Sequence, residues 1–412
     1  MALATEKKST NPLLIPNTFR LYRPILSHSL KEHFSSFSLS LRDFSSLMPL
    51  LISDYAPNVA IPWLLNGDNW EDAIVDMFKI HALTQNSDPA GPNVMNVTAL
   101  SVFMDWRQDS RTRKPIHGRE GEVAIVQGQA SFSKAMATLM KHTAGINNFV
   151  NLDAHSHTAL DQFRAEGIDT MNLTAAFLMA DEIKKLNLIR SDLDTMICGI
   201  DAGNLPLVKA LSQYLDLPIA IIRKWRESIM GGVQSKTHHE LIFGNVRGKR
   251  IILVDDMISS GGTIKKTVDE LLKNGAKEII ICATHAVLSG NDYYKNIQEV
   301  LELEEVRLVM TTNTIPLERP NGREKDRPFI LKEDGEKKKL EILDIDNFII
   351  WTLGILLNSK NFDEAKQKLK PHTLQLEDPA IIYEEITGQK MPKPKETAIY
   401  RKGGELHPLP QK

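Results

Sequence analysis

The residues best suited to chemistry in this sequence lie at the end of one apolar run. Ile251 to Val254 form a predicted buried strand that ends in two adjacent carboxylates, Asp255 and Asp256. A loop of small residues then leads into an amphipathic, helix-like stretch from Thr263. Backbone N–H groups at a helix N-terminus, together with the helix dipole, favour a phosphate, and nearby carboxylates accept hydrogen bonds from sugar hydroxyls. The segment therefore fits a ribose 5-phosphate.

The loop itself consists of Ser259, Ser260, Gly261, Gly262 and Thr263. An ordinary strand-to-helix turn capped by one of the two serines would look similar, because serine is a common N-cap residue. The paired acids directly upstream favour the functional interpretation, since a simple turn needs no carboxylates there.

Two further polar residues follow predicted strands. His155 comes after the strand Asn148–Leu152, and Asp201 comes after the strand Thr195–Gly199. His155 could pair with His157 in a transition-metal site, although further ligands are not obvious. Asp201 taken alone could be a helix N-cap.

A cationic stretch, Lys224-Trp225-Arg226, follows the predicted strand Ile219–Ile222. It opens the segment Arg226–Gly244, which lacks apolar periodicity and is therefore predicted to be a mobile loop. Cations at such a position can neutralise charge that builds up in a transition state, although a solvated strand end would contain the same residues.

The elements that must position these residues alternate between short apolar runs and longer amphipathic stretches from residue 58 onward. That alternation predicts βα units and a mainly parallel sheet. The other predicted strands are Val59–Leu65, Asn96–Met104, Arg250–Val254, Glu278–Thr284 and Arg307–Thr312. The predicted helices are Glu71–Ala82, Phe132–Lys141, Leu173–Leu186, Leu205–Tyr214 and Thr263–Asn274, and Leu340–Leu357 is a helix or a strand-helix pair.

The composition excludes several classes of protein. The 412 residues suggest two or three domains, and a formal net charge of -2 gives no electrostatic case for a nucleic-acid binder. Cys198 and Cys282 cannot build a disulfide framework, so a reducing compartment, and hence the cytoplasm, is expected. The longest apolar run, Phe348–Leu357, is shorter than the roughly 20 residues of a membrane span, so no membrane association is expected.

The N-terminal 42 residues allow two interpretations. They are poor in acids and rich in serine, as a transit peptide would be. The segments Phe19–Tyr22 and Ser29–Phe34 also fit a short strand feeding a helix, and this folded interpretation is preferred.

A family resemblance emerges from these motifs taken together. Val254–Thr263 resembles the phosphoribosyl diphosphate binding motif of type I phosphoribosyltransferase folds, and its surroundings resemble the ribose-phosphate diphosphokinase family. The resemblance covers about residues 58–357. The companion segments, in family order, are Arg107-Gln108-Asp109, Leu152–His155, Asp201-Ala202-Gly203, Ile221–Arg226, Thr284–Gly290 and Thr312–Pro316.

The resemblance implies roles for the matching positions. Asp255 and Asp256 would hold the ribose hydroxyls, and Ser259–Thr263 would cradle the 5-phosphate. His155 and Asp201 would contact Mg²⁺ and the ATP phosphates, a donor set that suits a hard cation. The implied ATP-binding residues are Arg107, Gln108, Phe44 and His155, and the implied catalytic residues are Lys224, Arg226 and His155.

The sequence also departs from the family pattern. Ser259-Ser260 stands where an acid is usual, Trp225 replaces the middle cation, and the nearest candidate for an acidic ATP-site segment, Phe44–Leu47, has no acid. Arg119–Ala124 and the Ser-Gly-Gly loop resemble the divergent class II synthetases, in which relaxed donor choice is typical. Phosphate and ADP regulation therefore does not follow from the resemblance.

The predicted fold is α/β, with two type I phosphoribosyltransferase domains and mainly parallel sheets. After an N-terminal arm (1–16), an ATP-side domain would span 17–165 and a ribose 5-phosphate-side domain 166–325. Residues 326–357 would return to the first domain, and 358–412 would be a partly disordered extension. The active site is expected between the domains at the carboxyl ends of the strands.

The resemblance implies a ribose-phosphate diphosphokinase that uses ATP and ribose 5-phosphate with Mg²⁺, as a homo-oligomer, dimer or hexamer. The C1 hydroxyl would attack the β-phosphorus of ATP, giving phosphoribosyl diphosphate and AMP. Two alternatives remain: a phosphoribosyltransferase that consumes phosphoribosyl diphosphate, and a non-catalytic regulatory subunit associated with the synthetase.

Overall fold

The computed structural model divides the chain into two compact units. Unit 1 comprises Met1–Thr174 and Ile345–Thr373, and unit 2 comprises Ala175–Asp344 and Leu374–Lys412. The first boundary between the units lies after Thr174, whereas the sequence predicts a domain boundary after residue 165. The segment 326–357, predicted to return to the first domain, is divided between the units at Asp344 and Ile345. The structure describes residues 58–62, 96–104, 113–115, 123–125, 132–155, 157–189, 193–200, 202–227, 236–288, 299–315, 340–374, 379–392, 399–402 and 405–408.

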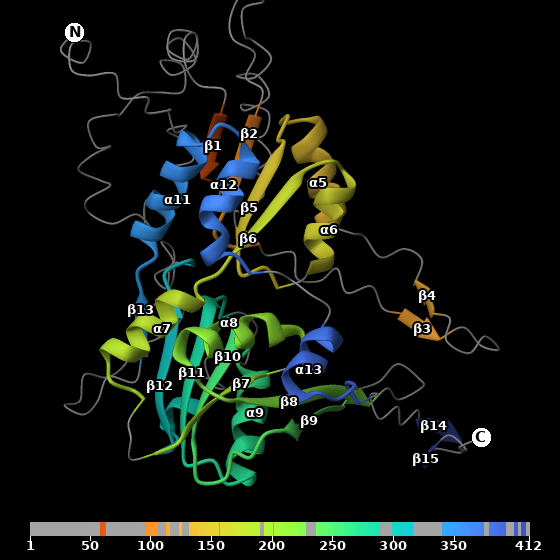
Figure 1. Cartoon of the computed structure of the whole chain (residues 1–412). Helices are drawn as coiled ribbons and strands as arrows, with labels where there is room; N and C mark the ends of the chain where they lie inside the picture. Colours follow the sequence, from red (N-terminus) through yellow and green to blue (C-terminus); the bar gives the residue numbers. More distant parts are fainter. Residues whose placement is uncertain are drawn as a thin grey trace, which may run out of the picture. The chain divides into compact units, whose positions relative to one another are not determined.

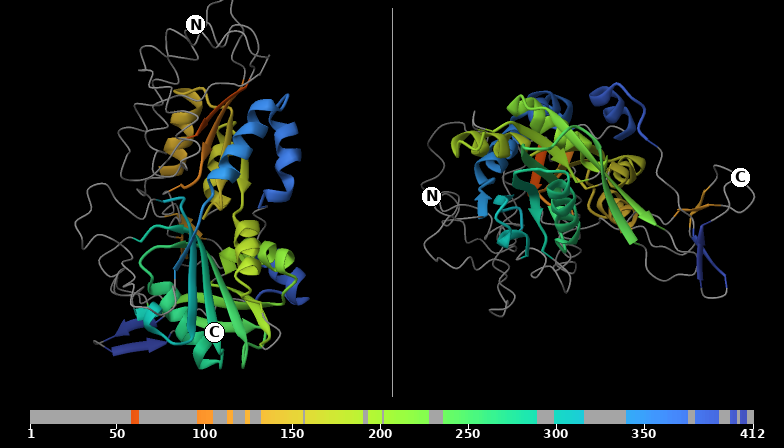
Figure 2. Two further views of the ribbon diagram at one scale, coloured as in Figure 1. Left: turned by 90° about the vertical axis from the view of Figure 1, so that its left-hand side faces the viewer. Right: turned by 90° about the horizontal axis from the view of Figure 1, so that it is seen from below.

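Unit 1 is built on a parallel sheet in the order β1-β2-β5-β6. Its strands are β1 (Asn58–Pro62), β2 (Asn96–Ser101), β5 (Asn148–Leu152) and β6 (Asp169–Leu173). Its helices are α5 (Phe132–His142), α6 (His157–Ala165), α11 (Asp346–Asn358) and α12 (Phe362–Leu369). Figure 2 shows α11 and α12 on the face of the sheet opposite α5, so both faces are covered.

The chain after α11 is ordered on unit 1. Lys366 of α12 pairs with Asp169 at 2.5 Å, and after the short η4 helix (Lys370–His372) the carbonyl of His372 accepts a hydrogen bond from the Thr174 N–H at 2.9 Å. The extension predicted from residue 358 therefore begins with a helix that has its own buried residues, Phe362, Ala365 and Leu369.

Unit 2 contains a seven-stranded sheet in the order β13-β12-β11-β10-β7-β8-β9. All neighbours are parallel except β8 and β9, which form an antiparallel edge. The strands are β7 (Thr195–Gly199), β8 (Ile219–Glu227), β9 (Lys236–Phe243), β10 (Arg250–Ile258), β11 (Glu278–Ala286), β12 (Val306–Thr312) and β13 (Leu340–Leu343).

The helices of unit 2 cover both faces of this sheet (Figure 1). They are α7 (Ala176–Lys185), the short η2 (Ala202–Asn204), α8 (Leu205–Leu215), α9 (Gly262–Lys273) and α13 (Pro379–Thr387). The connections β7-α8-β8 and β10-α9-β11 run in opposite directions along the sheet. Because such crossovers are right-handed, α8 and α9 lie on opposite faces.

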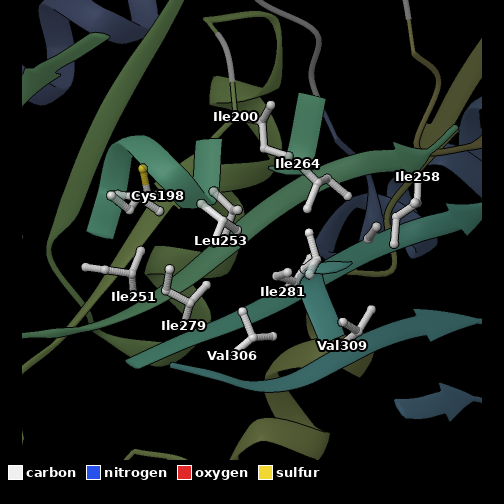
Figure 3. Packing of buried hydrophobic residues seen from close by; sticks show 14 of the residues in the cluster. Cys198, Ile200, Ile251, Leu253, Ile258, Ile264, Ile279, Ile281, Val306 and Val309 are labelled. Atoms are coloured by element: carbon white, nitrogen blue, oxygen red, sulfur yellow. The ribbon is translucent and has the colours of Figure 1, made fainter. Parts of the chain in front are cut away.

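The core of unit 2 on the α9 side is a cluster of aliphatic residues (Figure 3). Ile251 and Leu253 of β10, with Ile281 of β11, pack against Ile264 and Val268 of α9, and all five are at most 2% exposed. The alternate residues of the same strands are also buried, as expected for a parallel sheet covered on both faces.

The C-terminal helix α13 packs on the other face, beside β8. Ile382 and Tyr383 are each 1% exposed and contact Leu205 and Ile221. The buried guanidinium of Arg223 donates a hydrogen bond to the carbonyl of Pro392 at 3.1 Å. This part of the predicted extension is thus integral to unit 2.

Two secondary-structure predictions are wrong. Leu173–Leu186 was expected to be one helix, but Leu173 ends β6 and α7 begins only at Ala176. Arg226–Gly244 was expected to be a mobile loop, but Lys236–Phe243 forms β9. An edge strand is paired on one side only, which permits polar residues such as His239 and weakens the apolar alternation.

Two small hairpins complete the described elements. They are β3 (Arg113–Pro115) with β4 (Val123–Ile125), and β14 (Ile399–Lys402) with β15 (Glu405–Pro408). Among the described residues, no helix is both long enough and apolar enough to cross a membrane. The predicted helix Glu71–Ala82 and the N-terminal 42 residues lie outside the described residues.

Candidate functional site

The candidate site of unit 2 lies where the strand order of its sheet reverses. β7 and β10 are neighbours, and the chain proceeds from β7 toward β8 but from β10 toward β11. The carboxyl ends of the strands at such a switch point are the usual ligand-binding position in open α/β sheets. The predicted Asp-Asp segment, Asp255-Asp256, lies near the carboxyl end of β10, which continues to Ile258.

The two carboxylates have different surroundings. Asp256 is buried, at 4% exposure, whereas Asp255 is partly exposed. Oδ1 of Asp255 accepts a hydrogen bond from the backbone N–H of Asp256 at 3.0 Å and another from the side-chain amide of Asn204. Asn204 ends η2, directly after β7. The orientation of the Asp255 carboxylate is therefore set from both strands of the switch point.

The loop that follows β10 forms the start of α9. Gly261 is in the left-handed region with φ of 72°, which strains any residue with a side chain. Gly262 then begins the 12-residue helix α9, whose first N–H groups have no partner within the helix. Ser259 is partly buried and Ser260 is exposed. The predicted phosphate loop, Ser259–Thr263, thus has the strand-loop-helix geometry expected of it.

Lys224 lies next to this loop. Its Nζ is 3.5 Å from Oγ1 of Thr263. The prediction that Lys224 and Arg226 open an irregular loop is wrong, because both belong to β8 and pair with His239 and Thr237 of β9. Arg226 is placed by its backbone only, and its side chain lies outside the described part of the structure.

Two of the companion segments meet at the ends of β11 and β12. Nδ1 of His285 is 3.0 Å from Oγ1 of Thr314. Thr312 Oγ1 donates to the carbonyl of Thr284 at 2.6 Å. All four residues are at most 2% exposed. Buried hydrogen bonds therefore join the two segments where the strands end.

In unit 1, His155 follows β5 and is exposed. The turn before it is held tightly: Asp153 has a φ of 40°, and the backbone N–H of Ala154 donates to Oδ1 of Asn172 at 2.9 Å. Asn172 is itself 6% exposed. A buried amide on the neighbouring strand thus fixes the backbone that presents His155.

The sequence motifs did not single out Asn204, Asn172, Thr267 or His239 as site residues. Asn204 directly follows the Asp201-Ala202-Gly203 segment. This position beside a recognised motif is the one sequence signal that could have identified Asn204 as a site residue. The other three are recognised only through their tertiary contacts.

Several predicted site residues lie outside the described residues. These are Phe44, Arg107, Gln108 and Asp201. Among the described residues, no group of three or more His, Cys, Asp or Glu side chains could hold a metal ion. Because Asp201 lies outside the described residues, the structure does not test the predicted Mg²⁺ site of His155 and Asp201, which stays a prediction.

The two cysteines take no part in the site. Cys198 and Cys282 are free and buried, and burial raises the pKa of each thiol to about 12. Because the thiolate is the nucleophilic and metal-binding form, neither thiol is suited to catalysis or metal binding.

Comparisons with known proteins agree with this geometry. The phosphoribosyl transferase domain family matches residues 170–309. The ribose-phosphate pyrophosphokinase of Campylobacter jejuni is 32% identical over 222 residues, 54% of this chain and 62% of that protein. Ribose-phosphate pyrophosphokinase 4 of Saccharomyces cerevisiae is 32% identical over 189 residues, 45% of this chain and 52% of that protein. The matched regions thus span less than two thirds of the length of each of these relatives.

A solved structure shows the same fold. The phosphoribosylpyrophosphate synthetase of Mycobacterium smegmatis superposes with a TM-score of 0.51 and 24% identity, covering 73% of this chain and 82% of that chain. The predicted fold, α/β with mainly parallel sheets of phosphoribosyltransferase type, is confirmed. The predicted resemblance is confirmed as well: the chain is a divergent relative of the ribose-phosphate diphosphokinase family.

Proposed function

We propose that this protein is a ribose-phosphate diphosphokinase, which transfers the diphosphoryl group of ATP to the C1 hydroxyl of ribose 5-phosphate. The products would be phosphoribosyl diphosphate and AMP. The observation that carries the proposal is the position of Asp255 and Asp256 near the carboxyl end of β10, a few residues before the Gly261 turn and the N-terminus of α9. Acceptors for sugar hydroxyls and donors for a phosphate are thereby a few residues apart.

The sugar phosphate would bind through two sets of groups. The carboxylates of Asp255 and Asp256 would accept hydrogen bonds from the ribose 2- and 3-hydroxyls. The N–H groups of Ser259–Thr263 would donate to the 5-phosphate, supported by the dipole of α9. Such a site rejects a sugar that lacks the hydroxyls, because its acceptors would then be left without donors.

Lys224 and Arg226 would supply positive charge during the transfer. Lys224 lies beside Thr263, so its charge is available to the 5-phosphate as well as to the transferring group. Phosphoryl transfer depends mainly on positioning and charge stabilisation, and no covalent intermediate on the protein is required. Mg²⁺ would enter as part of the ATP substrate.

The ATP side of the reaction remains a prediction from the resemblance. Arg107, Gln108, Phe44 and His155 are the proposed contacts, and of these the structure describes only His155, which is exposed at the end of β5. Assembly into a homo-oligomer is likewise a proposal.

The experiment that tests this function uses the purified full-length chain with ATP, Mg²⁺ and ribose 5-phosphate. AMP and phosphoribosyl diphosphate should appear in equal amounts, and omission of ribose 5-phosphate should abolish both. The double variant Asp255→Asn with Asp256→Asn should lose turnover while its fold, checked by circular dichroism, is kept. Consumption of phosphoribosyl diphosphate with a nucleobase and without ATP would instead identify a transferase, and no turnover by either route would identify a non-catalytic subunit.

A further inference from the structure

Strand β9, at the β8–β9 edge of unit 2, contacts helix α9 (Figure 1). A chain of polar side-chain contacts joins this edge to the first turns of α9. Nδ1 of His239, on β9, is 2.8 Å from Oγ1 of Thr267, on α9. Thr267 Oγ1 is 3.0 Å from the carbonyl of Thr263, and Thr263 Oγ1 is 3.5 Å from Nζ of Lys224. The contacts thus run from the edge strand to the phosphate loop and then to a predicted catalytic cation.

The direction of these hydrogen bonds follows from the chemistry of the groups. A carbonyl oxygen can only accept, so Thr267 must donate its single hydroxyl proton to Thr263. Its oxygen then accepts from His239, which must carry a proton on Nδ1. Thr267 is 0% exposed, so water does not compete for this bond. The imidazole is therefore held in one orientation by a group that is itself fixed in α9.

The position of Lys224 is tied to that of His239. The two residues are directly opposite in the antiparallel ladder between β8 and β9, and opposite residues project from the same face of the sheet. The preceding pair on this face, Ile222 and Leu241, packs in the apolar cluster beneath α9. At 3.5 Å, the contact of Lys224 with Thr263 is too long to locate the ammonium group by itself.

We propose that His239 and Thr267 are positioning residues that hold the β8–β9 edge against α9, so that Lys224 stays beside the phosphate loop. Their effect on the site passes through Lys224. This inference rests on the proposed function where it takes the bound anion to be the 5-phosphate of ribose 5-phosphate. The positioning of Lys224 by His239 and Thr267 would act in the same way on any phosphate bound by Ser259–Thr263.

The test measures the affinity of the full chain for ribose 5-phosphate and for inorganic phosphate by calorimetry. His239→Leu and Thr267→Val each remove one partner of the bond and should raise both Kd values about 5-fold or more, the scale of one ordinary hydrogen bond. His239→Asn and Thr267→Ser keep a donor and a hydroxyl, and should restore most of the affinity. Thr387→Val is the matched control, because Thr387 Oγ1 also bonds to a helical carbonyl, that of Tyr383, at 2.8 Å.

The decisive arm repeats His239→Leu in a Lys224→Met background. If His239 acts through Lys224, the substitution should cause no further loss of affinity there. An equal loss in both backgrounds would overturn the proposal, as would unchanged affinity in His239→Leu and Thr267→Val accompanied only by a lower melting temperature.

The two ligands separate this inference from the proposed function. If the wild type binds phosphate but not ribose 5-phosphate, the proposed diphosphokinase function is contradicted. The phosphate titrations of the variants would still test the roles of His239 and Thr267. Failure of the wild type to bind either ligand would overturn both.

Discussion

The side-chain amide of Asn204 donates a hydrogen bond to Oδ1 of Asp255, so the residues that follow β7 are bonded to the end of β10. The bond restrains a carboxylate proposed to bind the ribose hydroxyls. Asn204→Leu should therefore weaken ribose 5-phosphate binding about 10-fold, the usual scale for a hydrogen bond to a charged group. Asn204→Asp should weaken it more, because it places a second negative charge beside Asp255. Asn358→Ala, which removes an exposed amide bonded to the Gly354 carbonyl, is the calorimetric control and should bind as the wild type does.

Lys224 should influence both turnover and sugar-phosphate binding. Its Nζ lies 3.5 Å from Thr263 Oγ1, so Lys224→Ala should raise the KM for ribose 5-phosphate as well as lower kcat. The fall in kcat/KM should be at least about 10²-fold, on the low side for a cationic clamp because Arg226 is proposed to share the role. Steady-state kinetics would show this, with the exposed Lys273→Ala as the control. Trp225→Arg, which restores the usual third cation, should change kcat far less. Equal kcat/KM in wild type and Lys224→Ala would mean that Lys224 has no catalytic part.

The turn that presents His155 should depend on Asn172. Asn172→Ala removes the acceptor of the Ala154 N–H, a bond of 2.9 Å in a buried setting. A buried amide left without its acceptor destabilises a protein by about 1–3 kcal/mol, and here the loss is concentrated in the turn. Hydrogen exchange of the peptide containing Ala154 should accelerate by about 10-fold or more. Unchanged protection of that peptide would show that Asn172 does not hold the turn.

The buried thiols should make the protein less stable at alkaline pH. Burial raises the pKa of Cys198 and Cys282 from 9.0 to about 12. Between these values the folded state binds more protons than the unfolded state, so the free energy of unfolding falls as pH rises through that window and is unaffected by the thiols below it. The urea midpoint should therefore drop less between pH 8 and pH 10 in the double variant Cys198→Ala with Cys282→Ala than in the wild type. Equal drops would contradict burial of the thiols.

The central strands were predictable from sequence, and the polar edges were not. Asn148–Leu152 and Thr195–Gly199 have the predicted bounds, because each contains consecutive apolar residues, Phe149-Val150 and Met196–Cys198, as strands buried on both faces of a sheet do. The strand β6 was missed because Asp169, Thr170 and Asn172 interrupt its apolar pattern. The edge strand β9 was missed for a similar reason.

The candidate site, like the fold, was predictable only in part from the sequence. Asp255, Asp256 and the following loop are recognisable because their chemistry lies in consecutive residues. Asn204, His239 and Thr267 contribute through contacts with residues distant in the chain, such as Asn204 with Asp255. No local pattern contains the contact between His239 and Thr267, and for Asn204 the only sequence signal is its position after Asp201-Ala202-Gly203.

The fate of the β-phosphorus of ATP tests the proposed function most directly. The full chain would be incubated with Mg²⁺, ribose 5-phosphate and ATP labelled at the β-phosphorus, and the products separated. If the C1 hydroxyl attacks that atom, the label should appear in the C1 diphosphate of the sugar product, with unlabelled AMP formed in equal amount. Label that appears in ADP, or in free pyrophosphate without a labelled sugar, would contradict diphosphoryl transfer by this protein.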